Sequence, residues 1–145
     1  LLTFATQEPG QREQEAAFRD LAERNAATLF ENAGERAEAG RAYYQLFQKE
    51  PARENYLIQA VENYRAAGLL EKAVEILEST LERSPFQFRA RHLLADILVE
   101  INTPESRAKA LTQSRILQIL EQENPGAIST DIRVDNQRRI ESLTK

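Results

Sequence analysis

Similar residues recur 34 positions apart in this chain. Small, aromatic and turn-forming residues all take part, and the matched pairs are Ala26 and Ala60, Phe30 and Tyr64, Gly34 and Gly68, Ala39 and Ala73, Tyr43 and Leu77, and Pro51 and Pro85. A fixed period in this range indicates that one supersecondary unit is stacked on the next, because a single unit cannot bury its apolar face alone. We therefore expect an array of similar units.

Each class of matched residue has a mechanical task in a pair of packed helices. The alanines let two helices approach closely, and the aromatic and leucine positions fill the remaining volume. Gly34 and Gly68 stand where a first helix must end, since glycine takes the left-handed conformation without a Cβ penalty. Pro51 and Pro85 are expected at the first position of a new helix, where the missing N–H costs nothing. The predicted unit is a helical hairpin.

These residues resemble the tetratricopeptide repeat family, whose 34-residue unit carries small, small, aromatic, small, aromatic and proline residues at these relative places. The resemblance covers residues 20–51 and 52–85 well. It continues through Leu94, Ala95 and Leu98, with Asn102 in place of the glycine. The third unit is lengthened, because Pro125 follows Pro85 by 125 − 85 = 40 positions. The resemblance implies an all-α fold, a right-handed superhelical stack of antiparallel helical hairpins with about seven helices.

The apolar periodicity and the helix-ending residues place the helices near 11–33, 35–49, 52–67, 70–83, 86–101, 104–123 and 131–143. A chain of 145 residues fits a single domain. Its expected parts are a frayed N-terminal segment over 1–10, hairpins over 11–51, 52–85 and 86–125, and a C-terminal capping segment over 126–145. Ile132, Ile140 and Leu143 suit a capping helix, although residues 127–134 can alternatively stay extended.

The resemblance also implies where a ligand binds, because the first helices of successive units in this family line a concave surface that holds a peptide or a partner helix. The polar residues of those helices form the candidate partner-binding groove: Arg24, Asn25, Thr28, Asn55, Gln59, Glu62, Arg89, His92 and Asp96. Amide and hydroxyl groups can pair with an extended backbone, and arginines can hold a carboxylate.

One column of the repeat, Thr28, Glu62 and Asp96, instead favours a ligand that carries positive charge. Charge reversal at Glu62 and Asp96 is therefore expected to weaken partner binding. A subtype of the family clamps the C-terminal carboxylate of chaperone tails with Lys, Asn and Arg side chains. Thr28 and Leu93 stand where that clamp needs Asn and a basic residue, so we do not expect this chain to bind such tails.

The chain offers little for catalysis or metal binding. His92 is its one histidine and it has no cysteine, which excludes sites built from several such ligands. His92 and Asp96 are four residues apart and are expected to make an ordinary helix contact. The solvated face of one predicted helix accounts for Glu75, Glu78 and Glu82. The glycines are scattered as helix terminators rather than gathered in a phosphate-binding loop. We expect no catalytic residue, metal or cofactor.

Charge and hydropathy exclude two further partners. The formal net charge is −4 and the pI is near 5.2, whereas nucleic-acid binding needs a concentrated basic face. The apolar runs are far shorter than the roughly 20 residues that span a bilayer, so direct membrane insertion within these residues is not expected. The expected partner is another protein.

The leading expectation is a non-catalytic interaction module or scaffold in a larger assembly, for example in secretion, envelope assembly or polysaccharide export. The preference for Arg over Lys hints at a bacterial source. The alternative is homo-oligomerisation through the long helix over 104–123, whose apolar face would comprise Ile101, Leu111, Ile116, Leu117, Ile119 and Leu120. The compartment stays open between cytoplasm and periplasm. Residues 1–4 read either as a frayed terminus or as the stub of a membrane tether upstream of residue 1.

Overall fold

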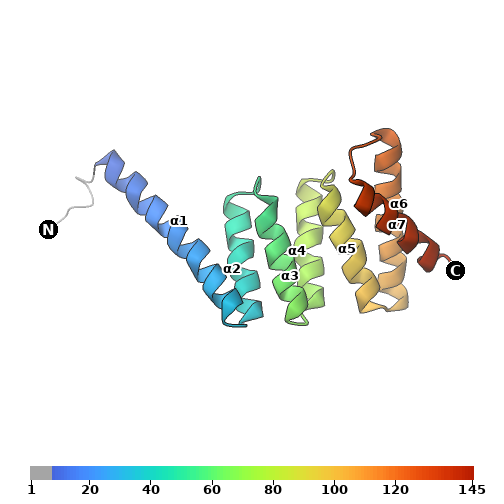
Figure 1. The fold of residues 1–145 in the computed structure, drawn as a ribbon, viewed down its shortest axis with the longest axis horizontal. Helices are drawn as coiled ribbons and strands as arrows, with labels where there is room; N and C mark the ends of the chain where they lie inside the picture. The colour runs from blue at the N-terminus through green and yellow to red at the C-terminus, as the bar shows by residue number, and fades with distance from the viewer. Residues whose placement is uncertain (1–7) are drawn as a thin grey trace. The chain divides into compact units, whose positions relative to one another are not determined.

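The computed structural model describes residues 8–145, and these residues form seven α-helices and no strand (Figure 1). The helices are α1 (Pro9–Asn32), α2 (Arg36–Lys49), α3 (Glu54–Ala66), α4 (Leu70–Arg83), α5 (Phe88–Ile101), α6 (Pro104–Glu123) and α7 (Thr130–Leu143). The all-α prediction is confirmed, and every helix end lies within two residues of its expected place.

Two expectations near the chain ends need correction. The alternative of an extended segment over 127–134 is wrong, because α7 begins at Thr130 and Ser129 caps it by accepting a hydrogen bond from the Ile132 N–H at 3.4 Å. The frayed segment was expected over 1–10, but α1 already includes Pro9 and Gly10. Proline is favourable at the start of a helix because its missing N–H has no helical partner there. Residues 1–7 lie outside the described part.

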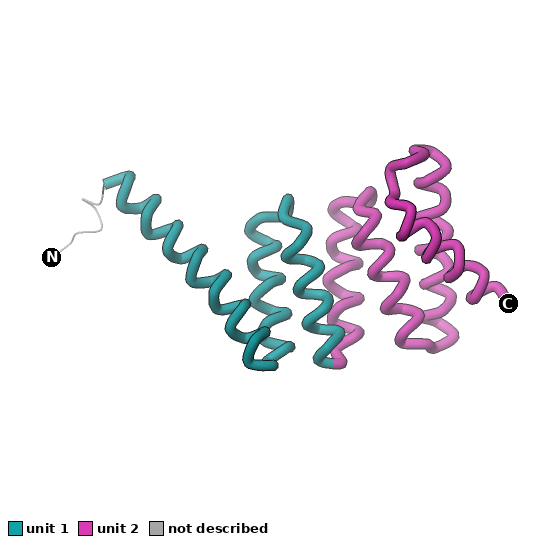
Figure 2. The backbone as a smooth tube through the Cα atoms, viewed as in Figure 1, with its two compact units in different colours: residues 1–67 teal, residues 68–145 magenta. Residues whose placement is uncertain are grey.

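The chain divides into two compact units, residues 1–67 and residues 68–145 (Figure 2). The boundary falls inside the expected hairpin over 52–85. In the first unit α2 packs against both α1 and α3. In the second unit α4, α5, α6 and α7 pack in chain order, and α7 also touches α5. Each unit is thus built from consecutive helices packed on one another.

The ends of the helices follow from local chemistry. Gly34 has φ +78° and closes α1 with two backbone bonds, from its own N–H to the Glu31 carbonyl and from the Glu35 N–H to the Phe30 carbonyl. This pair of bonds is the Schellman arrangement, which satisfies carbonyls that the helix leaves free. Gly68 and Asn102 also have positive φ, as expected for the residues that end α3 and α5.

Pro51 and Pro85 do not stand at the first position of a helix, which corrects that expectation. They lie in turns that precede α3 and α5. The turn at Pro51 is closed by a bond from the Arg53 N–H to the Glu50 carbonyl at 2.9 Å, and the turn at Pro85 has the equivalent bond from Gln87 to Ser84 at 3.2 Å. Proline pre-sets φ at the second position of such a turn.

The core of the first unit uses most of the matched small and aromatic positions, although Ala26 is only half-buried and its neighbour Ala27 is buried instead. Ala27, Ala39 and Ala60 have no exposed surface, and Tyr43 and Tyr64 are buried between the helices. Phe30 is only half-buried, because α1 packs chiefly against one helix, α2. In the second unit the positions that the repeat pattern predicts to be packed are also buried, namely Ala73, Leu77, Leu94, Ala95 and Leu98.

Candidate functional site

The predicted groove residues on α1 differ in exposure. Arg24 is half-buried, whereas Asn25 and Thr28 are exposed. The Thr28 hydroxyl donates to the Arg24 carbonyl at 3.1 Å, one turn earlier in the helix. Such a bond leaves the oxygen able to accept another donor, so Asn25 and Thr28 remain accessible polar groups on α1.

The predicted residues at the start of α3 line a pocket of about 510 Å³. Asn55 and Gln59 form part of its wall, and the remaining lining residues are Ala52, Arg53, Glu54 and Tyr56. The Arg53 guanidinium lies 5.9 Å from the centre of the Tyr56 ring, within the range of a cation–π contact. The pocket therefore combines two amides, a ring and ionised groups from the turn before α3 and the first two turns of that helix.

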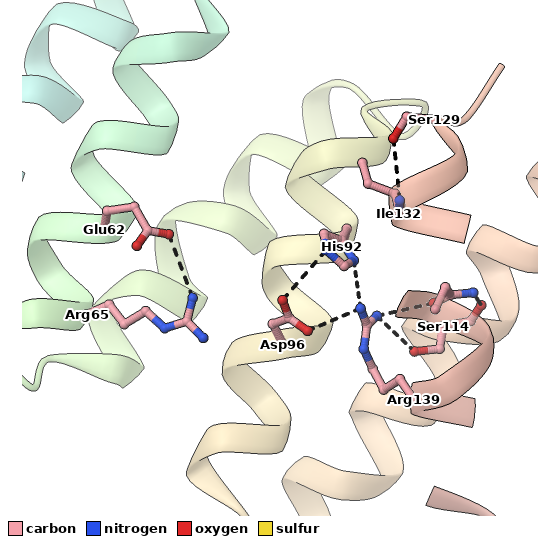
Figure 3. Close-up of polar contacts among 9 residues, drawn as sticks. Glu62, Arg65, His92, Asp96, Ser114, Ser129, Ile132 and Arg139 are labelled. Atoms are coloured by element: carbon pink, nitrogen blue, oxygen red, sulfur yellow. Dashed lines mark hydrogen bonds and ion pairs between the residues drawn. The ribbon is translucent and has the colours of Figure 1, made fainter. Parts of the chain in front are cut away.

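Glu62 lies further along α3 and is exposed. One of its carboxylate oxygens is 3.7 Å from the Arg65 guanidinium (Figure 3). The Glu62 side chain is 51% exposed and that of Arg65 28%, and surface pairs of this kind are worth about 0.2–1 kcal/mol, because water competes for the charges. Glu62 can therefore exchange Arg65 for a cationic ligand at little cost.

A buried asparagine that the sequence analysis missed anchors α3 to its neighbours. Asn63 is 1% exposed. Its amide nitrogen donates to the Glu31 carboxylate at 2.7 Å and to the Gln59 carbonyl at 2.8 Å, and its oxygen accepts from Arg36 at 3.2 Å. The register could have indicated this, since Asn63 follows the buried Ala60 by three positions on the same helix face. The network ties α1, α2 and α3 together beside Glu62.

The predicted residues on α5 fall into two environments. Arg89 is exposed, and His92 and Asp96 are half-buried. The His92 Nε2 atom lies 3.6 Å from an Asp96 carboxylate oxygen, so the expected contact across one helical turn is present. It belongs to a larger cluster than the sequence indicated.

Arg139 of α7 reaches the same two side chains (Figure 3). Its Nη2 atom lies 2.6 Å from His92 Nδ1 and 3.2 Å from Asp96 Oδ1. Its Nη1 atom donates to the Ser114 hydroxyl on α6 and to the Asn136 side chain on α7, both at 3.2 Å. Asn136 in turn donates to the Ser114 carbonyl at 2.8 Å. Three helices thus meet at the guanidinium of Arg139, a residue that is 7% exposed.

The electrostatics of this cluster keep His92 neutral. Burial lowers the pKa of His92 and outweighs the upward effect of Asp96, and the nearby Arg139 charge lowers it further, while Asp135 acts in the opposite direction. A neutral ring can accept from Arg139 at Nδ1 and direct its Nε2 proton toward Asp96. Burial also lowers the pKa of Arg139, against the opposing effect of Asp96. Arginine nevertheless stays charged at neutral pH.

A second pocket, of about 230 Å³, lies between α6 and α7. Glu121 forms part of its wall and holds the connecting loop, because its carboxylate accepts from the Gly126 N–H at 3.2 Å and from Arg133 at 3.3 Å. The Gly126 hydrogen bond, with further help from Ile128 and Arg133, lowers the pKa of Glu121 despite its desolvation. Glu121 is therefore anionic at neutral pH.

The apolar residues proposed for self-association through the 104–123 helix differ in exposure. Leu117 is buried, and Ile101, Leu111, Ile116 and Leu120 are half-buried. Ile119 is 51% exposed. Ile119 is thus the one clearly exposed member of this set, and self-association through this helix stays a prediction.

Neither a protein-family model nor a curated protein matches the chain. None of the helices formed by residues 8–145 is long and apolar enough to cross a membrane. Within the same stretch, no three His, Asp or Glu side chains are grouped so that they could hold a metal ion.

Proposed function

We propose that this chain is a non-catalytic protein-interaction module that binds a peptide segment or helix of another protein. The proposed binding face comprises the predicted polar residues, exposed and half-buried, of the first helices in a right-handed superhelical stack similar to tetratricopeptide repeats. The observation that carries the proposal is the pocket at the start of α3, because two of the predicted binding residues, Asn55 and Gln59, line it.

The chemistry of this pocket suits a polypeptide. Asn55 and Gln59 each offer a donor and an acceptor, which is what the N–H and C=O groups of an extended chain require. The Tyr56 ring provides an apolar wall for a side chain, while Glu62 adds an exposed carboxylate one turn of helix after Gln59. This set favours a partner segment that is polar or basic.

The contact between α5 and α7 supports the same preference. There, residues of the predicted binding face, His92 and Asp96, already hold a guanidinium from another helix. A face that binds one arginine-bearing helix within the chain is chemically suited to bind another from a partner. The exposure of the α6 residues favours no second candidate function.

The proposal is tested by selecting binders from a random-peptide library on the purified chain and titrating them by calorimetry. We expect Glu62→Arg and the double variant Asn55→Ala/Gln59→Ala each to weaken the selected peptides by at least about tenfold, equivalent to about 1.4 kcal/mol. Glu62 is preferable to Asp96 for charge reversal, because Asp96 also pairs with Arg139.

Glu78→Arg is the matched control, since Glu78 is an exposed glutamate on α4 that lies outside the predicted binding face. It should leave the affinity unchanged while altering the net charge by the same amount as Glu62→Arg. Equal affinities for all four proteins, or a library that yields no binder, would contradict the proposal.

A further inference from the structure

We propose that the surface of α5 and α6 beneath α7 is a recognition site for an arginine side chain on a helical partner segment, and that α7 keeps this site closed with its own Arg139. The inference rests on the proposed function, because His92 and Asp96 belong to the proposed binding face. It adds a ligand class and a means of regulation that the repeat pattern does not contain.

The site is defined by the acceptors that surround the guanidinium. His92 Nδ1 and Asp96 Oδ1 come from α5, and Ser114 Oγ comes from α6. These three acceptors belong to α5 and α6 rather than to α7, and they face both terminal nitrogens of the Arg139 guanidinium. A lysine has a single ammonium group and cannot reproduce this planar set of contacts, so the site selects arginine.

α7 is held mainly by polar contacts. Its two buried residues are Asn136 and Arg139, whereas its apolar residues Ile132, Ile140 and Leu143 are only half-buried. Val134 is 41% exposed. Hydrogen bonds add little net stability when water or a competitor can replace them, at about 0.5–1.5 kcal/mol each. The contrast with α4, which buries Ala73, Ile76, Leu77 and Leu81, shows how little apolar surface fastens α7.

The pocket of about 230 Å³ between α6 and α7 further weakens this attachment. Side chains that line this open pocket lack, on that side, the dispersion contacts that a filled interface between α6 and α7 would supply. Glu121 and Ile128 instead hold the connecting loop, since Glu121 accepts from Gly126 and Ile128 is buried. The loop is thus a fixed end about which α7 can detach.

Charge makes the two occupants mutually exclusive. A second cation beside Arg139 would be repelled at close range, and the Asp96 carboxylate that pairs with Arg139 is the anchor that an incoming arginine also needs. The partner segment must therefore replace α7 rather than add to it. Binding is expected to expose α7, which couples recognition to a change at the C-terminal end of the chain.

Hydrogen exchange of the unmodified full chain tests whether α7 is displaceable. We expect the amides of α7 to exchange at least about tenfold faster than those of α5, because local opening of α7 requires less free energy than opening of the unit. Exchange of α7 and α5 at the same rate would show that α7 leaves only when the whole unit unfolds, and this would overturn the proposal.

Recognition is tested with a fluorescent peptide that carries residues 128–145 of this chain. The Arg139→Gln variant should bind this peptide at least about tenfold more tightly than the wild-type chain. Its own α7 no longer places an arginine in the site, so it competes less with the peptide. Adding Asp96→Asn should remove the gain, and peptides with Gln or Lys in place of Arg139 should bind weakly. Arg138→Gln, a change at the exposed neighbouring arginine, is the matched control and should behave as the wild type.

Arg139→Gln that binds the peptide no better than Arg138→Gln would contradict the proposal. If Arg139→Gln does not fold, the exchange comparison on the unmodified chain decides alone. The α3 variants described above report on the proposed function independently, because Asn55, Gln59 and Glu62 belong to the first unit. If the α7 experiments contradict the closed arginine site while the α3 variants weaken peptide binding as expected, the proposed function still stands.

Discussion

Gly40 lies within α2, where glycine is normally less favourable than alanine, and its neighbour explains its presence. The Tyr64 ring of α3 packs directly against its Cα, so that a Cβ at Gly40 would lie 2.9 Å from Tyr64 Cδ1. Tyr64 is itself buried and cannot move aside freely. The two helices can approach this closely only because residue 40 has no side chain.

Gly40→Ala is therefore expected to destabilise the chain. Overpacking costs about 1–3 kcal/mol, and the better helix propensity of alanine returns up to about 1 kcal/mol, which leaves a net loss of about 1 kcal/mol. Urea unfolding followed by circular dichroism measures this change in the free energy of unfolding. Gly10→Ala is the control, because nothing lies within 4 Å of a Cβ at that position. Equal stability of the two variants would refute the steric argument.

Among the elements, α7 has an attachment that we expect to depend on the protonation of His92. His92 faces Asp96 on its own helix and Arg139 and Asp135 on α7. Protonation at Nδ1 would replace the acceptor used by Arg139 with a donor and place two cations in contact. The docking of α7 is thus compatible with a neutral ring and opposed by a charged one.

The expected pH dependence follows from the lowered pKa of His92. Between that folded-state pKa and the ordinary value of 6.5, the unfolded chain binds more protons than the folded one. The stability that depends on neutral His92 is therefore fully present above about pH 6.5, and the free energy of unfolding falls as the pH drops through this window. Urea unfolding from about pH 8 to about pH 5 should show a larger loss for the wild type than for His92→Gln.

The comparison of His92→Gln with the wild type cancels the contribution of the carboxylates to the pH profile, because both proteins contain the same acidic groups. Glu121 titrates at lower pH, since its pKa is lowered, and its contribution is lost only as the pH falls further. Parallel pH profiles for the two proteins would show that His92 does not govern the attachment of α7.

At the scale of the whole molecule, the chain consists of two compact units with separate polar networks. The hydrogen bonds of Asn63 to Glu31, Arg36 and Gln59 join groups of the first unit, and the Arg139 cluster joins α5, α6 and α7 of the second. A buried amide that loses its partners costs about 1–3 kcal/mol. A substitution that removes hydrogen bonds from one network should consequently lower the stability of the unit that contains it.

Asn63→Ala is expected to destabilise the first unit by about 2 kcal/mol, because the variant loses hydrogen bonds to Glu31, Arg36 and the Gln59 carbonyl. Hydrogen exchange should accelerate over α1–α3 and stay nearly unchanged over α4–α7. Asn55→Ala, at an exposed asparagine of the same helix, should leave both units protected. An equal loss of protection in both units would show that they unfold together.

Much of the architecture was predictable from the sequence, because its determinants are local. The 34-residue period and the small residues indicated most of the buried positions, with Ala26 and Phe30 only half-buried, and Gly34, Gly68 and Asn102 indicated where helices end. Helix ends were expected within two residues because they depend on residues a few positions away in the chain. The roles of Pro51 and Pro85 were misjudged, since proline suits both a helix start and the turn before it.

The candidate site was predictable only in part. The sequence indicated the polar faces of α1, α3 and α5, and it indicated the His92–Asp96 contact, because these follow from helical spacing. Arg139 lies 47 residues from His92, and no periodicity relates the two positions. Only the packing of α7 against α5 and α6 decided that a guanidinium would fill this site. Such a contact depends on where a whole helix docks, which is a property of the tertiary structure rather than of any local pattern.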